Sequence, residues 1–125
     1  MKERTFTLAA NLFMWLSIYF AGTYSTIVAI GFFVFCDMIT GSMASYKRGE
    51  KFSSSKLKNT VFKFIAYGIA VFVAHVIEKQ FIPDFPSIKI IGGFIAYIEL
   101  KSINENIEAI TGINLFGSVI KKFKR

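Results

Sequence analysis

The hydrophobic pattern opens with a long uncharged stretch that runs from Thr5 to Cys36. As a single helix rising about 1.5 Å per residue it would be roughly 48 Å long, well beyond the ~30 Å hydrocarbon core of a bilayer. The residues at 21–25, Ala-Gly-Thr-Tyr-Ser, offer a place to fold back because glycine gives the backbone freedom. We therefore expect two membrane-spanning helices here, at about 5–22 and 25–46.

A second interpretation of the first of these helices is a cleaved signal peptide. Lys2 and Arg4 provide a basic start, and small residues follow at 21–23. However, the bulky Trp15 and Tyr19 lie close to the cleavage site that this would require, and a second apolar segment follows at once. We expect the segment to be retained as a membrane helix.

The next apolar segment, 64–77, contains no Asp, Glu, Lys or Arg. The long side chains of Lys63 and Glu78 at its ends can reach the interface, so we expect a third crossing at about 61–79. A polar, basic loop precedes it, at about 47–60. The basic residues of this loop that we expect to face lipid headgroups are Lys47, Arg48, Lys51, Lys56 and Lys58.

The fourth segment, at about 85–100, has the weakest pattern. Pro83 and Pro86 force a turn before it, because proline lacks a backbone donor and disfavours helix at the preceding residue. Lys89 interrupts the segment early, and we expect its side chain to extend to the outer interface.

The distribution of basic residues supports a fourth crossing. Short loops rich in Lys and Arg stay on the cytoplasmic side of a membrane. The N-terminus, the loop at about 47–60 and the tail at 121–125 are all basic. Four crossings place all three clusters, and so both termini, in the cytoplasm. Three crossings with an interfacial fourth helix are the alternative.

After the fourth segment the pattern becomes that of an amphipathic helix. Ile103, Ile107 and Ile110 recur in steps of four and three, as on one face of a helix. This helix and the basic tail, over about 101–125, would continue the fourth segment into the cytoplasm. The apolar stripe would lie on the membrane or on a partner, and the tail would rest on anionic lipid.

Composition agrees with a membrane protein, since 54% of the residues are hydrophobic, 17% are aromatic and the mean hydropathy is +0.51. A soluble domain of this size would need more polar surface. The lone Cys36 cannot form an internal disulfide. The predicted fold class is therefore all-α: one multi-pass integral membrane domain, 1–125, with about four transmembrane helices and an amphipathic C-terminal cytoplasmic helix.

The sequence contains no recognisable catalytic chemistry. It has one His and one Cys, and it lacks paired carboxylates at a known spacing, an HExxH motif and a glycine-rich phosphate loop. The basic loop has few aromatic residues, so lipid headgroups explain it better than nucleic acid does. We expect no enzyme activity, cofactor, metal or nucleic-acid partner, and a function exerted by assembly in the membrane.

Asp37 is the most informative single residue. A carboxylate inside a transmembrane helix costs about 2.5–3.5 kcal/mol on insertion scales and usually faces protein or water. Small residues at spacing four follow it, which lets helices approach closely. We expect this face to pack helices or to line a pore. Its residues are Asp37, Thr40, Gly41, Ala44, Ser45 and Gly49. Alternatively, Asp37 lies near the interface and pairs with Lys47 or Arg48.

Three segments, taken together, carry a resemblance to a known family. They are Asp37–Gly41 with Ala44 following, the basic loop with Gly49 and the serines at 53–55, and the run Glu99–Asn106 with Gly112 after it. In this order and spacing they resemble the small four-helix phage holins, a family that includes toxin-secretion holins. The sequence departs from the family at 57–59, where a glycine is expected before the third helix.

The resemblance implies a protein that accumulates in the bacterial cytoplasmic membrane and then forms homo-oligomeric lesions or pores. Such lesions release an endolysin, which is a cell-wall hydrolase, and lead to host cell lysis. Toxin secretion requires the same pore with another cargo, so lysis and export both stay open. In such an assembly we expect the helix at about 25–46 to pack across protomers through Gly41 and Ser45. The residues expected to make cytoplasmic contacts are Glu99, Ser102, Glu105 and Asn106.

Two other functional classes remain. A small ion channel or transporter would use Asp37, His75 and Glu99 as an ion path and show graded, selective conductance. A membrane scaffold would instead recruit a partner through the isoleucine stripe at 103–110 without opening any pore.

Overall fold

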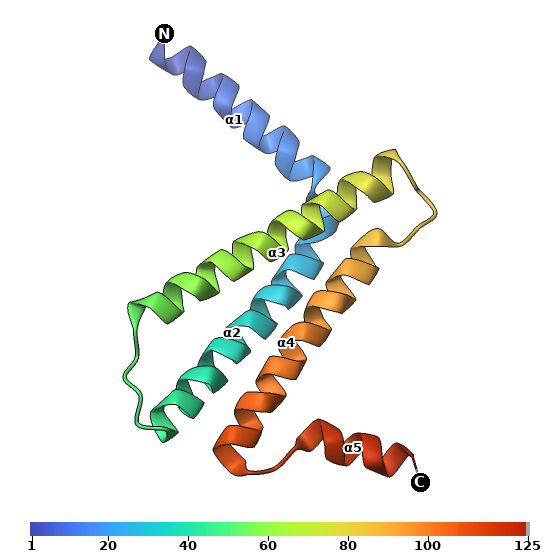
Figure 1. Cartoon of the computed structure of the whole chain (residues 1–125). Helices are drawn as coiled ribbons and strands as arrows, with labels where there is room; N and C mark the ends of the chain where they lie inside the picture. Colours follow the sequence, from blue (N-terminus) through green and yellow to red (C-terminus); the bar gives the residue numbers. More distant parts are fainter. Residues whose placement is uncertain (125) are drawn as a thin grey trace.

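The computed structural model describes residues 1–124 and shows helices joined by short turns, with no β-strand in that range (Figure 1). The all-α class predicted from the sequence is confirmed. The elements are α1 (Lys2–Tyr19), the 3-10 turn η1 (Ala21–Thr23), α2 (Tyr24–Lys47), α3 (Ser54–Gln80), α4 (Ser87–Thr111) and α5 (Leu115–Phe123).

Helices α2, α3 and α4 form a three-helix bundle (Figure 1). Ser45 near the end of α2 contacts Lys56 near the start of α3, so these two helices are antiparallel. The turn at 81–86, which contains both prolines, sends α4 back along α3. Helices α2 and α4 are therefore parallel, and the end of α2, the start of α3 and the end of α4 lie together at one end of the bundle.

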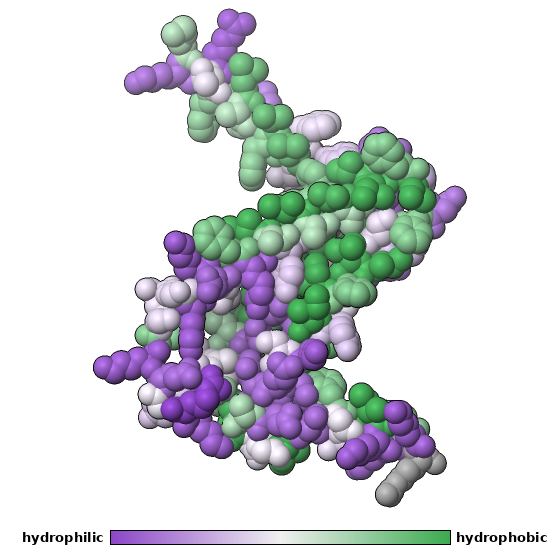
Figure 2. All heavy atoms as spheres, viewed as in Figure 1, coloured by the Kyte–Doolittle hydropathy of each residue, from purple (hydrophilic) through white to green (hydrophobic). Residues whose placement is uncertain are grey.

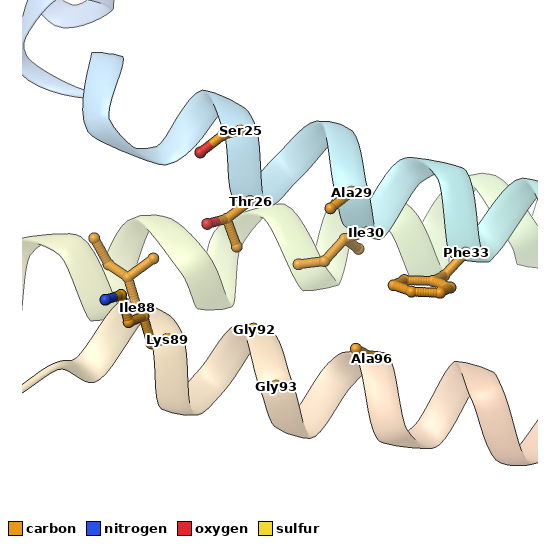
Figure 3. A pocket seen from close by; sticks show the side chains of 10 residues that line it. All are labelled: Ser25, Thr26, Ala29, Ile30, Phe33, Ile88, Lys89, Gly92, Gly93 and Ala96. Carbon is orange, nitrogen blue, oxygen red and sulfur yellow. The ribbon is translucent and has the colours of Figure 1, made fainter.

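Helices α2 and α4 make the most extensive contact in the bundle, and glycine makes room for it. A Cβ atom at Gly92 would lie 2.9 Å from Cγ2 of Thr26, a distance that real Cβ contacts essentially never show. Figure 3 shows Thr26 pointing from α2 toward Gly92 on α4. Small residues thus let these two helices pack backbone to backbone.

The bundle has a small core and an apolar exterior. The buried apolar core consists of Ile30, Val34, Val71 and Ile95. Most large apolar side chains point outward instead, and Phe32, Val73 and Phe94 are each more than half exposed. Figure 2 shows apolar residues across the α3 side of the bundle and hydrophilic residues gathered at the end that carries the α2–α3 loop.

This exterior is that of a membrane protein. Two helical stretches, Ala21–Lys47 and Ser54–Gln80, are long and apolar enough to cross a bilayer. Their outward apolar side chains are unfavourable in water but are suited to contact with acyl chains. The backbone hydrogen bonds are made within each helix, so no backbone polar group has to face lipid.

Helix α1 stands apart from the bundle (Figure 1) and buries none of its side chains. The bend occurs within the predicted segment 21–25, where Thr23 Oγ1 donates to the Phe20 carbonyl at 2.7 Å. Tyr24 OH also donates to the Ser17 carbonyl at 2.7 Å. However, α1 does not fold back along α2 but points away from it, so the chain is bent here without forming a helical hairpin.

The basic loop is shorter than the predicted 47–60. Helix α3 already begins at Ser54, because the Ser53 side chain accepts a hydrogen bond from the Lys56 N–H and caps the helix. Lys56 and Lys58 therefore lie in the first turns of a helix, and only 48–53 separate α2 from α3. Sequence patterns could not place this boundary, because lysine and serine are compatible with both loop and helix start.

Two glycines with positive φ end helices at the same end of the bundle. At Gly49 (φ 77°) the Gly49 N–H bonds the Tyr46 carbonyl and the next N–H bonds the Ser45 carbonyl, which is a Schellman motif. Gly112 (φ 74°) ends α4. Asn114 then caps α5, so part of the C-terminal tail forms a separate short helix.

Candidate functional site

The most unusual feature of the bundle is a cluster of polar side chains where its three helices meet. One member comes from α2, two come from α3 and two come from α4. We call it the Lys63 cluster, and its members are Asp37, Lys63, Tyr67, Glu99 and Asn106.

Lys63 is the centre of this cluster. Its Nζ atom donates to Asp37 Oδ2 at 2.8 Å and to Glu99 Oε2 at 3.1 Å, so one ammonium bridges carboxylates from two other helices. Tyr67 OH donates to the second Glu99 oxygen at 2.7 Å. Glu99 is only 1% exposed, and both of its carboxylate oxygens are satisfied inside the protein.

Asn106 completes the contact between α4 and α2. Its Nδ2 atom donates to Asp37 Oδ1 at 3.0 Å and to Thr40 Oγ1 at 3.1 Å. A Cβ at Gly41 would lie 3.4 Å from that same nitrogen, so glycine leaves the amide just enough room. The Asp37 carboxylate is therefore held by hydrogen bonds from both α3 and α4, and the Glu99 carboxylate by hydrogen bonds from α3.

The charges of the Lys63 cluster do not balance. With both carboxylates and the ammonium ionised, two negative charges face one positive charge. Buried ions cost several kcal/mol each unless they are paired and hydrogen-bonded, and removal of one partner typically costs ~3–5 kcal/mol. The charges of the cluster are therefore satisfied only while the three helices lie together, and they need water or polar partners if the helices separate.

A second, exposed ionic group lies at the basic end of the bundle. Glu50 accepts from Arg48 Nε at 3.1 Å and from Lys56 Nζ at 3.2 Å, while the same Lys56 Nζ donates to Ser45 Oγ at 2.7 Å. Hydrogen bonds from Arg48 and Lys56 lower the pKa of the Glu50 carboxyl from 4.5 to about 2. This group ties the α2–α3 loop to both helices that flank it.

Comparison with known proteins assigns the family. A model of the bacteriophage holin family matches residues 14–125, which is most of the chain. The chain belongs to the bacteriophage holin family. No curated protein and no solved structure matches it. The resemblance drawn from the sequence segments is thereby confirmed, and most of α1 lies before the matched region.

This holin is a membrane protein of a family whose members are generally not enzymes. Among residues 1–124, no group of three or more His, Cys, Asp or Glu side chains has an arrangement that could hold a metal ion.

The structure pairs Asp37 differently from the alternative considered above. Lys47 Nζ donates to the Ile110 carbonyl and Arg48 pairs with Glu50, so neither contacts Asp37. The partner is Lys63, which we had expected at the interface. The signal in the sequence was that Lys63 and Tyr67 lie four apart on one helix face and that two acids in apolar helices need a counter-charge.

The small-residue face of α2 is occupied within the holin chain. Ala44 is 1% exposed and Ser45 is 6% exposed, while Gly41 faces Asn106. Gly49 packs against nothing and serves to end α2. Contact with another protomer through Gly41 and Ser45 therefore stays a prediction, and it would require α3 and α4 to move away first.

The four residues expected to make cytoplasmic contacts divide into two groups. Glu99 and Asn106 point into the Lys63 cluster, inside the bundle. Ser102 lines a polar pocket beside that cluster, and Glu105 is exposed. In the single chain Glu105 is the one of the four that is exposed, and contact of these residues with a partner stays a prediction.

His75 lies apart from the Lys63 cluster. It is 2% exposed, and neither ring nitrogen has a hydrogen-bond partner. It packs against the rings of Tyr19 and Phe20, at centroid distances of 5.1 and 5.3 Å. Twelve residues of helix separate it from Lys63, about 18 Å along the axis, so it does not continue a polar path through the cluster.

Proposed function

We propose that this holin assembles in the bacterial cytoplasmic membrane into homo-oligomeric lesions that let an endolysin, or a secreted toxin, cross and so cause host cell lysis. The observation that carries the proposal is the Lys63 cluster: paired charges from three helices lie inside a bundle whose exterior is apolar. Family membership supplies the class of activity.

In the mechanism that we favour, the cluster acts as a latch. The single chain satisfies both carboxylates internally, so it can reside in lipid without exposing a charge. If α2, α3 and α4 move apart, the freed carboxylates and ammonium cannot face acyl chains. These charged groups must face water or another copy of the chain. Chains whose helices have separated are therefore more stable in an assembly lined by polar groups than as single chains in lipid.

Four crossings with both termini in the cytoplasm fit this arrangement. The basic residues of the α2–α3 loop lie at the same end of the bundle as the C-terminal end of α4. Helix α5, which contains Lys121 and Lys122, follows α4 at that end. The positive-inside rule places this end in the cytoplasm. Helix α4, about 37 Å long, would cross alongside α2 and α3, and α1 would cross separately.

The topology is testable by labelling cysteines in intact cells with a membrane-impermeant maleimide. The native Cys36 is first replaced by alanine, and single cysteines are then introduced at Lys2, Lys51 or Asp84. We expect labelling only at Asp84→Cys, in the turn before α4. Labelling at Lys2→Cys would contradict a cytoplasmic N-terminus. Labelling at Lys51→Cys would show that the α2–α3 loop faces outward, so the orientation of the bundle would be the opposite of the proposed one.

The function itself is testable by inducible expression in a bacterium, with and without an endolysin that lacks a secretion signal. Membrane potential and culture density are recorded together. We expect a delay, then abrupt depolarisation, and lysis only when the endolysin is present. Graded, ion-selective depolarisation would instead indicate a channel, and steady growth with an intact potential would indicate a scaffold.

A further inference from the structure

Two adjoining hollows lie between α2 and α3 at the basic end of the bundle. One is a polar pocket of about 250 Å³, and the other is an apolar groove of about 290 Å³. Met38, Leu57 and Thr60 line both of them, so the two form one continuous depression. Its polar part lies toward the α2–α3 loop, and its apolar part extends along the helices toward Gly31.

The polar pocket is suited to an anion. Arg48 and Lys56 line it, each with about half of its side chain exposed, and the Thr60 and Ser102 side chains also line it. Glu50 pairs with both cations, so these three exposed side chains carry a net charge of +1 at the pocket mouth. Asp37 also lines the pocket, and its carboxylate oxygens accept from Lys63 and Asn106. The net negative charge of the Lys63 cluster therefore confines an anion to the mouth, beside Arg48 and Lys56.

The apolar groove is suited to a hydrocarbon chain. Val34, Phe35, Val61 and Phe64 line its walls, and its surface is almost entirely apolar. Gly31 also lines it, and a Cβ there would lie 3.3 Å from the Phe64 ring, which would have to move by a few tenths of an ångström. The groove runs on the outward surface of the two helices that are apolar enough to span a bilayer.

We propose that this depression binds one anionic phospholipid, with its phosphate at Arg48 and Lys56 and one acyl chain in the groove beside Val61. The order of the two parts matches a lipid of the cytoplasmic leaflet, polar at the loop and apolar toward the membrane centre. The inference rests on the proposed function only in placing the basic end in the cytoplasm. The bound lipid would bridge α2 and α3 one turn from the Lys63 cluster, and so stabilise the latched state.

The test is native mass spectrometry of the full-length protein in detergent, titrated with phosphatidylglycerol or phosphatidylcholine. We expect one tightly retained phosphatidylglycerol and much weaker retention of phosphatidylcholine. Arg48→Gln removes a charge-assisted contact and should lower the phosphatidylglycerol affinity roughly tenfold. Val61→Trp fills the groove from an exposed position and should lower it by a similar factor, while Glu50→Gln should raise it.

Two matched variants serve as controls. Lys51→Gln removes the same charge from the same loop outside the pocket, and Ile69→Trp adds the same bulk to an exposed position of α3 outside the groove. Each should change the affinity less than about twofold. Equal retention of the two lipids, or losses in the controls equal to those in Arg48→Gln and Val61→Trp, would overturn the site.

Lipid binding and depolarisation of cells are measured in separate assays, so the lipid site and the proposed function can each fail independently of the other. Abrupt depolarisation in cells without selective lipid binding would overturn this inference and leave the proposed function standing. Selective binding that Arg48→Gln and Val61→Trp weaken, in a chain that never depolarises cells, would support the lipid site and overturn the proposed function. Displacement of the lipid by inorganic phosphate alone would overturn the role of the groove.

Discussion

Within residues 1–124, Lys63 is the one cation that contacts both Asp37 and Glu99. Lys63→Met should leave two carboxylates unpaired inside the bundle and lower the free energy of unfolding by on the order of 3 kcal/mol. Unfolding of the purified protein in mixed micelles measures this change. Lys58→Met is the matched control, because Lys58 lies on the outside of the same helix, and it should change stability by less than about 0.5 kcal/mol.

The loss in Lys63→Met should be reversible by a second change. If the cost arises from an unpaired buried charge, adding Glu99→Gln removes that charge and should recover part of the stability, since the amide can still accept from Tyr67. A double-mutant cycle on the same unfolding assay measures the coupling. Strictly additive losses would mean that Lys63 stabilises the bundle through packing of its stem and not through its charge.

Glu50 provides a prediction on pH outside the membrane-spanning segments. Its carboxyl has a pKa lowered from 4.5 to about 2, so its pairing contributes to stability above pH 4.5 and is lost as the pH falls toward 2. Arg48→Gln should move the pKa back toward 4.5, as measured by NMR titration of the Glu50 side chain. The group is exposed, so the associated change in stability should be small. An unchanged pKa in that variant would show that Arg48 does not hold the carboxylate.

At the scale of helices, the close packing of α2 on α4 predicts opposite effects at two adjacent glycines. Gly92→Ala places a Cβ 2.9 Å from Thr26 Cγ2, and it should destabilise the bundle by about 1–3 kcal/mol. Gly93→Ala meets nothing within 4 Å and should be neutral or stabilising by up to ~1 kcal/mol, because alanine favours helix.

A second substitution distinguishes crowding from a change in helix propensity. Thr26→Ser removes the methyl group that the new Cβ would meet, so it should relieve most of the loss in Gly92→Ala. The same assay in mixed micelles measures both variants. If Gly92→Ala and Gly93→Ala had equal effects, the close contact between α2 and α4 would be absent in the folded protein.

The helices were the most predictable part of this chain, because uncharged runs, the two prolines and Gly112 mark their extent directly. The boundary at Ser54 was missed, since it depends on a side-chain cap that composition does not reveal. The direction of α1 was also missed. A bend at 21–25 is visible in the sequence, but the hydrogen bonds from Thr23 and Tyr24 that set its direction are not.

At the scale of the whole molecule, the candidate site was only half predictable. Asp37 was identified because a charge inside an apolar helix is costly. That argument needs only the position of the residue in its own helix. Its pairing with Lys63 depends on how three helices come together. Lys63 stands at the edge of an apolar run, where an interfacial lysine is the ordinary interpretation, so only the packing of α2 and α4 against α3 reveals its role.

In the proposed mechanism the structure is a latched state, and its helices must separate before lesions form. The geometry at the other end of the bundle offers a reversible lock for this step. Thr26→Cys with Gly92→Cys, in a Cys36→Ala background, brings two Cβ atoms to a separation suited to a disulfide between α2 and α4. In the proposed topology this pair lies toward the oxidising periplasmic side.

The most direct measurement is therefore the membrane potential of cells that express this locked variant, before and after addition of a reductant. Thr26→Cys alone in the same background is the control for the reductant itself. We expect the oxidised double-cysteine protein to accumulate without depolarisation, and reduction to trigger abrupt depolarisation within the culture. Depolarisation at the normal time with the disulfide fully formed would contradict the account, because α2 and α4 would then remain together in the lesion.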